Sequence, residues 1–405
     1  MPHPGRRTDL DWLRIIAFGF LIIYHIECFY GTWPWRANSQ YATWKVLPLL
    51  QLSTPWRLLL LFLISGVATR FMMDKTPTGR FVQSRATRLL IPLAFGMLVV
   101  VPPQTYVHVI EYLGYSGDFL GFYPQYLTGA GGWNAPGEIL ITPEWAHLWF
   151  IAYLFIFTLV AVAVGPRLKT LPSEAFAWFC KAPWIFVVPM ILIALANALI
   201  APFSTVEHLF IGDWRNVLVF CAAVLLGYSI AKHEPFFEAC DKQRYVALAI
   251  AVSGYLAIAA LWLSGIESSI PGGFAMGYAI LNPIQGWATV VAAFGFARRH
   301  LRRDSRLRRY LTDAVFPYYV IHQTTIVVAG YWLTQMNLPM PVEVSLLILV
   351  TVASCVIVYE VARRIWILRP LFGLKLERKP STEQSPRDRS SPKAGRRPAE
   401  SQFAN

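Results

Sequence analysis

Charged residues are scarce in this sequence. They make up 15% of its 405 residues, whereas hydrophobic residues make up 56% and the mean hydropathy is +0.45. This balance excludes the two or three soluble domains that the length alone would allow, and it is typical of a polytopic integral membrane protein. Strand-like alternation of polar and apolar residues is also missing, so we predict an all-α fold.

Cysteine is sparse as well, and its spacing forms no motif. The five cysteines, with no CxxC pair among them, are Cys28, Cys180, Cys221, Cys240 and Cys355. A disulfide framework or a cysteine-based metal site would need paired or clustered spacing. We therefore expect neither, and we predict no metal.

Long apolar runs, by contrast, are frequent, and ten of them have about the 17 to 25 residues that cross a bilayer as a helix. They cover residues 12–30, 55–73, 89–110, 147–164, 184–201, 216–231, 245–264, 279–297, 315–333 and 342–362, of which the sixth is short. The first run follows Arg6 and Arg7, as in a signal peptide, but it is long and lacks an A-x-A-like cleavage site. We predict ten transmembrane helices, the first of them uncleaved.

The net charge of +13 raises the question of nucleic-acid binding, and the distribution of the basic residues answers it. With both termini in the cytoplasm, the exterior loops hold only Arg36, Lys45, Arg57 and Arg215, and the other 32 of the 36 lysines and arginines lie at the cytoplasmic side. This is the positive-inside distribution expected of an inner or plasma membrane protein. The run RRHLRRDSRLRR fits that topology and is also suited to anionic lipid or a phosphorylated ligand.

The chain divides into two parts. Residues 1–376 form the predicted transmembrane domain, with no second globular domain and no long internal repeat. The polar, proline-rich segment 377–405 is expected to be a disordered cytoplasmic tail.

Two ionisable residues lie inside the first apolar run, LDWLRIIAFGFLIIYHIECFY. A helix advances about 1.5 Å and 100° per residue, so Arg14 and His25 are separated by roughly 16 Å along the axis and only about 20° around it. Arg14 then lies at the cytoplasmic mouth, where Asp11 can pair with it, and His25 lies near mid-membrane. This spacing suits an elongated ligand such as acyl-coenzyme A. The alternative is that Arg14 reaches the headgroups and His25 hydrogen-bonds a neighbouring helix.

Three further ionisable residues occupy comparable positions. His322, in FPYYVIHQTT, lies inside the ninth run and is either functional or a packing histidine. Arg85 and Arg88, in RATRLLIP, begin the third run with i, i+3 spacing and therefore face the same way. Their guanidinium groups are suited to clamp phosphate, although positive-inside flanking also explains them.

The longest exterior loop, at about residues 111–146, contains no lysine or arginine. Its acidic residues are Glu111, Asp118, Glu138 and Glu144, and its aromatic residues are Tyr112, Tyr115, Phe119, Phe122, Tyr123, Tyr126, Trp133 and Trp145. Rings beside carboxylates suit a polyhydroxylated ligand, and the alternative is an aromatic belt at the membrane interface. The segment PEWAHLWF places Glu144, His147 and Trp149 where an external acceptor would arrive, and the alternative for His147 is an interfacial histidine without a chemical role.

Taken in order, these motifs resemble those of the membrane-bound acyltransferase family 3. The stretch from LD to RIIAFGFLIIYH resembles the opening of that family, LFLISGV its FFxxSGF segment, RATRLLIP its Arg-x-x-Arg element, HLWFIAYL its HLWFL helix and FPYYVIHQ its YxxHQ helix. The closing YEVARRIWILRPLFG makes the chain most similar to the glucan-modifying, succinyltransferase-like branch. The resemblance implies ten helices and transfer of an acyl group, acetyl or succinyl, from cytoplasmic acyl-CoA to a hydroxyl of an extracytoplasmic carbohydrate.

The resemblance also assigns roles to four residues. It implies that Arg14, His25, Arg85 and Arg88 are functional residues; we expect the three arginines to hold the CoA phosphates of the donor and His25 to act as general base on the acceptor hydroxyl. Two features depart from the family. Val67 stands where phenylalanine is frequent, and no SGNH-like hydrolase domain follows the tenth helix. We therefore expect direct transfer to the glycan acceptor or a separate periplasmic partner.

Other roles stay open at this point. Ser65 and His322 are candidate donors to the oxyanion formed during acyl transfer, and an acyl-histidine intermediate is an alternative to general-base catalysis. The main rival function is a transporter or exporter, in which buried histidines relay protons and Arg14 binds an anionic solute. A structural scaffold would leave the aligned polar residues unexplained.

Overall fold

The computed structural model describes residues 7–135, 138–170, 172–204, 209–264 and 271–375, so the predicted tail at 377–405 lies outside the described residues. The fold is helical, as predicted. Its helices are α1 (Thr8–Phe29), α2 (Leu47–Ser53), α3 (Arg57–Met73), α4 (Thr78–Phe95), α5 (Pro102–Tyr112), α6 (Phe119–Thr128), α7 (Trp149–Leu168), α8 (Ser173–Phe179), α9 (Trp184–Leu199), α10 (Trp214–Ile230), α11 (Glu234–Leu263), α13 (Pro271–His300), α14 (Arg306–Gln335), α15 (Met340–Arg364) and α16 (Leu368–Leu371). A small hairpin pairs β1 (Asn134–Ala135) with β2 (Glu138–Ile139).

Six helical segments of the described chain are long and apolar enough to cross a membrane. They are Thr8–Phe29, Trp44–Met73, Ala146–Leu168, Glu234–Leu263, Gly272–His300 and Met340–Arg364. A seventh results if the bent pair Thr78–Val100 and Pro102–Tyr112 forms one span. The other three predicted runs lie in α9 and α10, which are shorter apolar helices, and in α14, which is not among the six. Ten crossings and cytoplasmic termini stay predictions.

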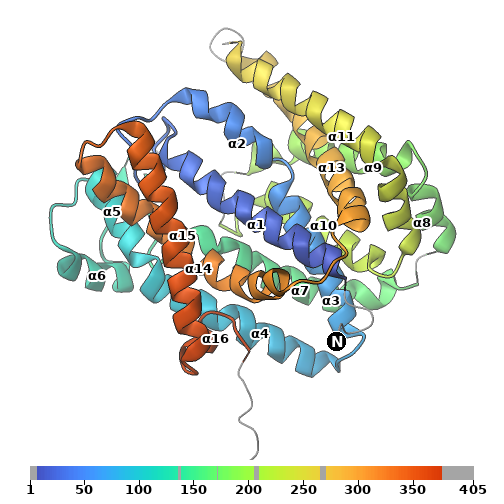
Figure 1. The fold of residues 1–405 in the computed structure, drawn as a ribbon, viewed down its shortest axis with the longest axis horizontal. Helices are drawn as coiled ribbons and strands as arrows, with labels where there is room; N and C mark the ends of the chain where they lie inside the picture. Colours follow the sequence, from blue (N-terminus) through green and yellow to red (C-terminus); the bar gives the residue numbers. More distant parts are fainter. Residues whose placement is uncertain (1–6, 136–137, 171, 205–208, 265–270, 376–405) are drawn as a thin grey trace, which may run out of the picture.

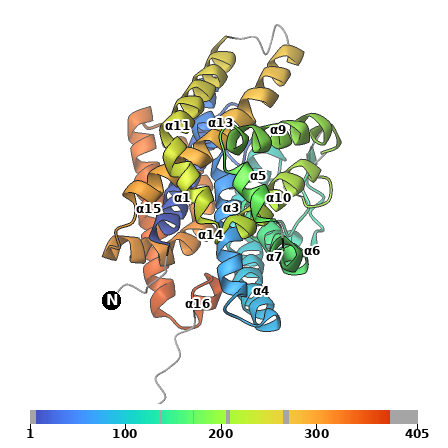
Figure 2. The same cartoon turned by 90° about the vertical axis from the view of Figure 1, so that its right-hand side faces the viewer.

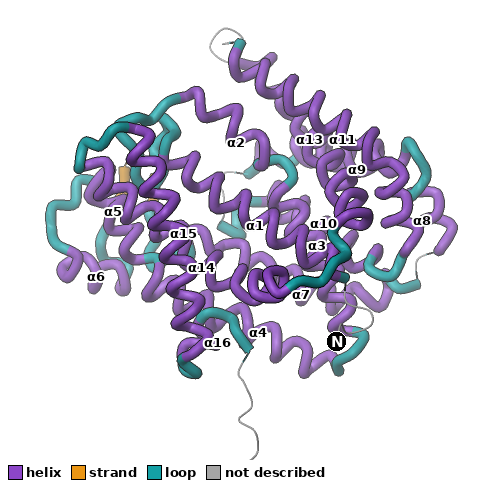
Figure 3. The backbone as a smooth tube through the Cα atoms, in the orientation of Figure 1, coloured by secondary structure: helices purple, strands orange, loops and turns teal. Residues whose placement is uncertain are grey.

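Helix α1 runs through the middle of the bundle, where it packs against α14, α3 and α13 (Figure 1). Close pairs elsewhere are α3 with α10, α14 with α15, and α11 with α13, whose hairpin projects beyond the rest in both views (Figures 1 and 2). Helices joined mostly by short loops make up most of the described chain (Figure 3). The contact between α1 and α14 brings together two helices that are far apart in the sequence.

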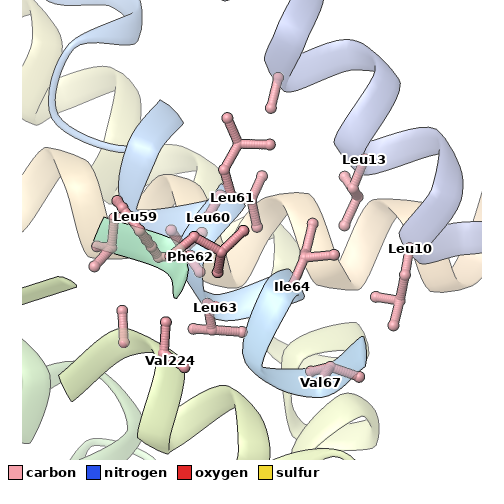
Figure 4. Packing of buried hydrophobic residues seen from close by; sticks show 14 of the residues in the cluster. Leu10, Leu13, Leu59, Leu60, Leu61, Phe62, Leu63, Ile64, Val67 and Val224 are labelled. Atoms are coloured by element: carbon pink, nitrogen blue, oxygen red, sulfur yellow. The ribbon is translucent and has the colours of Figure 1, made fainter. Parts of the chain in front are cut away.

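Helices α3 and α10 touch through their backbones, which explains two glycines. A Cβ at Gly66 would collide with the carbonyl oxygen of Val224, and a Cβ at Gly227 would collide with that of Leu63. Small residues at a helix crossing allow this close approach. Around the crossing, apolar side chains of α1, α3 and α10 form the core, with Leu63 beside Val224 (Figure 4). Val67 is buried in the same core.

A π turn at Gly96–Val100 separates α4 from α5 and bends the pair by 43°. Such a turn disturbs the regular helical hydrogen bonds, so its carbonyls need other partners. The carbonyl of Val100 accepts a hydrogen bond from Thr324 Oγ1 of α14 at 2.8 Å. The bend fixes α5 against α14, and this contact positions Gln104 for the site described below.

An ion cluster joins the last residues of α3 to segments after α7 and α10. Asp74 pairs with Arg70 at 2.9 Å, with Lys169 at 2.8 Å and with Lys232 at 2.5 Å. Burial alone would raise the pKa of the Asp74 carboxyl, but the hydrogen bonds from these three cations outweigh burial and hold that pKa well below its usual range. The cluster therefore ties three distant segments together at one end of the bundle.

Candidate active site

Two of the predicted site histidines meet inside the bundle. His25 of α1 and His322 of α14 are 297 positions apart in the sequence, yet His25 Nδ1 and His322 Nε2 are 2.9 Å apart. Both side chains are buried, with exposed fractions of 9% for His25 and 0% for His322. Each residue lies roughly 25 Å from the N-terminal end of its helix. The parallel packing of α1 and α14 thus brings the two rings to the same depth.

The acceptors around this pair determine where its protons lie. His322 Nδ1 faces the carbonyl oxygen of Tyr319 at 2.8 Å, and because a carbonyl can only accept, Nδ1 of neutral His322 carries the proton. His322 Nε2 is then an acceptor, so His25 Nδ1–H donates the bond between the rings. In this tautomer His25 Nε2 keeps its lone pair, while the backbone of Leu21, four positions earlier, also hydrogen-bonds the ring of His25. His25 is therefore arranged to take a proton.

His147 lies beside this pair, and both of its ring nitrogens have hydrogen-bond partners in the protein. Its Nε2 donates to the carbonyl of Val320 at 3.0 Å, and its Nδ1 accepts from Gln104 Nε2 at 3.3 Å. Gln104 Oε1 in turn accepts from Gln323 Nε2 at 3.0 Å. Both ring nitrogens of His147 are therefore committed to the protein, as are those of His322. In the part of the chain that the structure describes, no group of three or more His, Cys, Asp and Glu side chains is placed to hold a metal ion.

Two aromatic rings and an arginine enclose His25. The ring of Trp35 stacks on the imidazole with the centroids 5.8 Å apart and the planes at 17°, and the ring of Tyr24 meets it edge-on at 5.3 Å. The guanidinium carbon of Arg57 lies 4.0 Å from the centroid of the Tyr24 ring. Trp35 belongs to the loop 31–43 that connects α1 with α2. The imidazole of His25 therefore lies between the helix core on one side and the loop 31–43 on the other.

The loop 31–43 is fastened by an ion pair. Arg36 donates to both carboxylate oxygens of Glu144, at 2.6 and 2.7 Å, and Thr105 Oγ1 donates to the same carboxylate at 2.7 Å. Glu144, predicted to border the acceptor, is thus occupied by protein groups. Its observed contacts are those of an anchor that keeps Trp35 over the histidine.

The three predicted arginines lie toward the other end of α1. Arg14 precedes His25 by eleven positions in one uninterrupted helix, and its Nη2 donates to the carbonyl of Thr312 at 3.0 Å. Arg85 is buried and lies close enough to Arg14 and Arg88 for their charges to act on it. Like charges gathered in one place repel one another unless an anion joins them. The structure therefore gathers the three guanidinium groups near this end of α1, where the carboxylate of Asp313 also acts on Arg88.

The remaining predicted residues lie apart from His25. Asp11, expected to orient Arg14, forms an ion pair with Arg308 of α14. Ser65 Oγ donates to a carbonyl of its own helix at 2.7 Å and lies roughly 12 Å along α3 from the first residue of that helix. Trp149 is buried in the helix core, where its ring meets other aromatic rings.

The aromatic exterior loop forms a small core of its own. Phe122 and Tyr126 of α6 are buried together with Trp133, and the rings of Phe122 and Trp133 stack at 4.8 Å. These three rings cover one another. Their packing favours neither the ligand reading nor the membrane-belt reading of that loop.

The sequence analysis missed four residues of the site. Trp35, Gln104 and Gln323 had been given no role, and Arg57 had been counted as one more exterior cation. The available signals were the position of Gln323 directly after His322 and the position of Arg57 at the edge of an apolar run. Trp35 and Gln104 reach the histidines through a loop and a helix bend, which periodicity does not reveal.

Comparison with known proteins agrees with the resemblance. A model of the acyltransferase 3 family, described as an acyltransferase domain, matches residues 7–360. The chain is similar to Glucans biosynthesis protein C of Salmonella schwarzengrund (strain CVM19633), with 22% identity over 93% of this chain and 96% of the relative. It is also similar to Glucans biosynthesis protein C of Escherichia coli O139:H28 (strain E24377A / ETEC), with 21% identity over 95% of this chain and 99% of the relative.

No solved structure matches. The family match nevertheless extends over most of the sequence and includes the helices that supply His25, His322 and the three arginines. With several apolar spans in the same region, the chain is a multi-pass membrane protein that belongs to the acyltransferase 3 family.

Proposed function

We propose that this protein moves an acyl group from acyl-CoA at the cytoplasmic side to a carbohydrate hydroxyl at the outer side of a bacterial inner membrane. Membership of the family supports acyl transfer. The name of the relatives, Glucans biosynthesis protein C, favours a glucan or a related surface polysaccharide as the acceptor. The observation that carries the proposal is the His25–His322 hydrogen bond, which leaves His25 Nε2 unprotonated.

The donor end of the proposed site is the arginine group. Guanidinium forks bind phosphate oxygens in pairs, so Arg14, Arg85 and Arg88 are suited to the phosphates of CoA. The rise of α1 from Arg14 to His25 is roughly 16 Å, which is comparable to the length of a pantetheine arm. A thioester attached to that arm would then reach the imidazole.

His25 acts as the general base in the proposed reaction. Its Nε2 takes the proton of the acceptor hydroxyl while the hydroxyl oxygen attacks the thioester carbon. The tetrahedral intermediate then breaks its carbon–sulfur bond, CoA leaves as a thiolate, and the imidazolium returns the proton to that sulfur. The products are an acyl ester and free CoA. Throughout the reaction, His322 Nε2 accepts the hydrogen bond from His25 Nδ1–H and thereby stabilises the imidazolium of His25.

The test uses purified protein in liposomes with radiolabelled acyl-CoA donors and a glycan extract. Release of CoA and transfer of label to glycan are followed for wild type and for His25→Ala. His300→Ala is the matched control, because His300 is an exposed histidine at the far end of α13. We expect transfer in wild type and control and its loss in His25→Ala protein that remains folded.

The opposite outcome would favour a transporter. If no donor supports CoA release or label transfer, while proton or solute flux across the liposome depends on His25, the acyltransferase proposal is wrong.

A further inference from the structure

Arg57 is a deeply buried cation without a buried anion to neutralise it. It begins α3 and is 2% exposed. Its Nη1 donates to Ser53 Oγ at 2.7 Å, and its guanidinium group lies on the ring of Tyr24. Its Nε is buried and has no hydrogen-bond partner among the described residues. No carboxylate among the described residues forms an ion pair with Arg57. The carboxylate of Glu27 acts on its charge, but from beyond ion-pair distance.

Arg308 is a second buried arginine of this protein, and its ion pairs provide a comparison for Arg57. It is 1% exposed, and it pairs with both Asp11 and Asp304. Taking a guanidinium group out of water is costly, and attraction to a carboxylate is what normally offsets that cost. Arg57 is equally buried but lacks such a partner. An unpaired charge inside a membrane domain indicates a group that meets its anion from outside the chain.

The position of Arg57 identifies where that anion would lie. The ring of Tyr24 contacts both the guanidinium group of Arg57 and, edge-on, the imidazole of His25. The charge of Arg57 also acts on both His25 and His322. Arg57 therefore lies in the same neighbourhood as His25 and His322, where the proposed acyl transfer would take place.

We propose that Arg57 binds a negatively charged oxygen of the acyl group undergoing transfer; this rests on the proposed function and adds a substrate-binding residue to it. Such an oxygen has two possible sources. One is the thioester carbonyl oxygen, which becomes negative when the acceptor hydroxyl attacks. The other is a second carboxylate at the far end of a dicarboxylic acyl group. Both need a forked donor in a site without water.

Comparing the kinetics of donors with and without a distal carboxylate distinguishes the two sources of the negatively charged oxygen. Succinyl-CoA and butyryl-CoA have acyl chains of similar length, but only the first ends in a carboxylate. Arg57→Gln keeps a polar side chain and removes the charge. Arg215→Gln is the matched control, since Arg215 is a partly buried arginine held by Asn197 at 2.7 Å on α10, away from the histidines.

If Arg57 receives the distal carboxylate, Arg57→Gln lowers kcat/KM for succinyl-CoA by about 100-fold and leaves butyryl-CoA within about threefold. If it receives the oxyanion, kcat falls by about 100-fold for both donors while KM stays nearly constant. Either result supports the proposal. Unchanged kinetics with both donors in folded protein would overturn it.

Arg57→Lys covers the case in which the glutamine variant does not fold. Lysine keeps the charge but lacks the planar fork, so we expect the same pattern of loss at smaller magnitude, and equal activity of Arg57→Lys and wild type with both donors would overturn the proposal. Failure of this inference is distinguishable from failure of the proposed function. In the first case wild type transfers acyl groups and the Arg57 variants do so equally well, whereas in the second case wild type transfers none.

Discussion

Replacing His322 by phenylalanine removes the imidazole that accepts the His25 Nδ1 proton but keeps a ring between α1 and α14, and the backbone of Leu21 still hydrogen-bonds the His25 ring. A hydrogen bond contributes about 0.5–1.5 kcal/mol between neutral groups and about 1.5–3 kcal/mol when one group is charged. His25 becomes charged as it takes the acceptor proton, so its bond to His322 strengthens by about 1–1.5 kcal/mol, which is roughly tenfold in rate. The variant also permits the tautomer of His25 that cannot act as a base, which adds at most about another factor of ten.

The expected result is therefore a fall of roughly 10- to 100-fold in kcat for His322→Phe. KM for the proposed acyl-CoA donor should stay within about threefold, because the arginines at the other end of α1 are untouched. His322→Gln, which offers a carbonyl oxygen to the same N–H, should restore part of the rate.

The assay is transfer of radiolabelled acyl groups in liposomes, with His300→Phe as the control for an exposed histidine. A wild-type kcat in His322→Phe would refute the orienting role of His322. Equal losses in the phenylalanine and glutamine variants with a raised KM would show a structural role instead.

Two predictions concern stability, measured by thermal unfolding in detergent. Arg308→Met should lower the free energy of unfolding by about 2–3 kcal/mol, since it strands two partly exposed carboxylates, whereas Arg57→Met should change it by less than about 1 kcal/mol or raise it; the reverse order would contradict the contrast between the two arginines. Asp74→Asn should destabilise the protein at neutral pH. Because the pKa of Asp74 is held below its unfolded value, that stability is present above the ordinary carboxyl range and is lost as pH falls toward the folded pKa. Wild type and Asp74→Asn should therefore converge in acid, and a difference that persists there would contradict the assignment.

Local geometry explains why part of the site could be predicted from the sequence. Arg14 and His25 belong to one helix, and a helix places residues eleven positions apart on the same face whatever surrounds it. The same holds for Arg85 and Arg88, which are separated by one turn. The helical fold was predictable for a similar reason, because the apolar runs that form the spans are local features of the chain.

The contacts between helices were not predictable in the same way. His322 was recognisable as a buried histidine, but its partner is 297 positions away, and no period or spacing encodes that pairing. Asp11 was assigned to Arg14, a neighbour on its own helix, and the structure pairs it with Arg308 of α14. Arg57 was taken for an exterior cation because charge counts along a sequence contain no information about burial.

The uninterrupted form of α1 connects these observations to mechanism. Arg14 and His25 both belong to the uninterrupted helix α1, so the distance between the proposed phosphate-binding residue and the proposed base does not depend on loops or on the packing of other helices. Two residues of α14 contact this helix at two positions along its length: His322 contacts His25, and Arg308 contacts Asp11. A donor held by its phosphates would therefore present its thioester at a fixed height, next to the imidazole and to Arg57. If Arg57 binds an oxygen of the acyl group, substitutions at Arg57 should change the choice of acyl donor without changing the distance from Arg14 to His25.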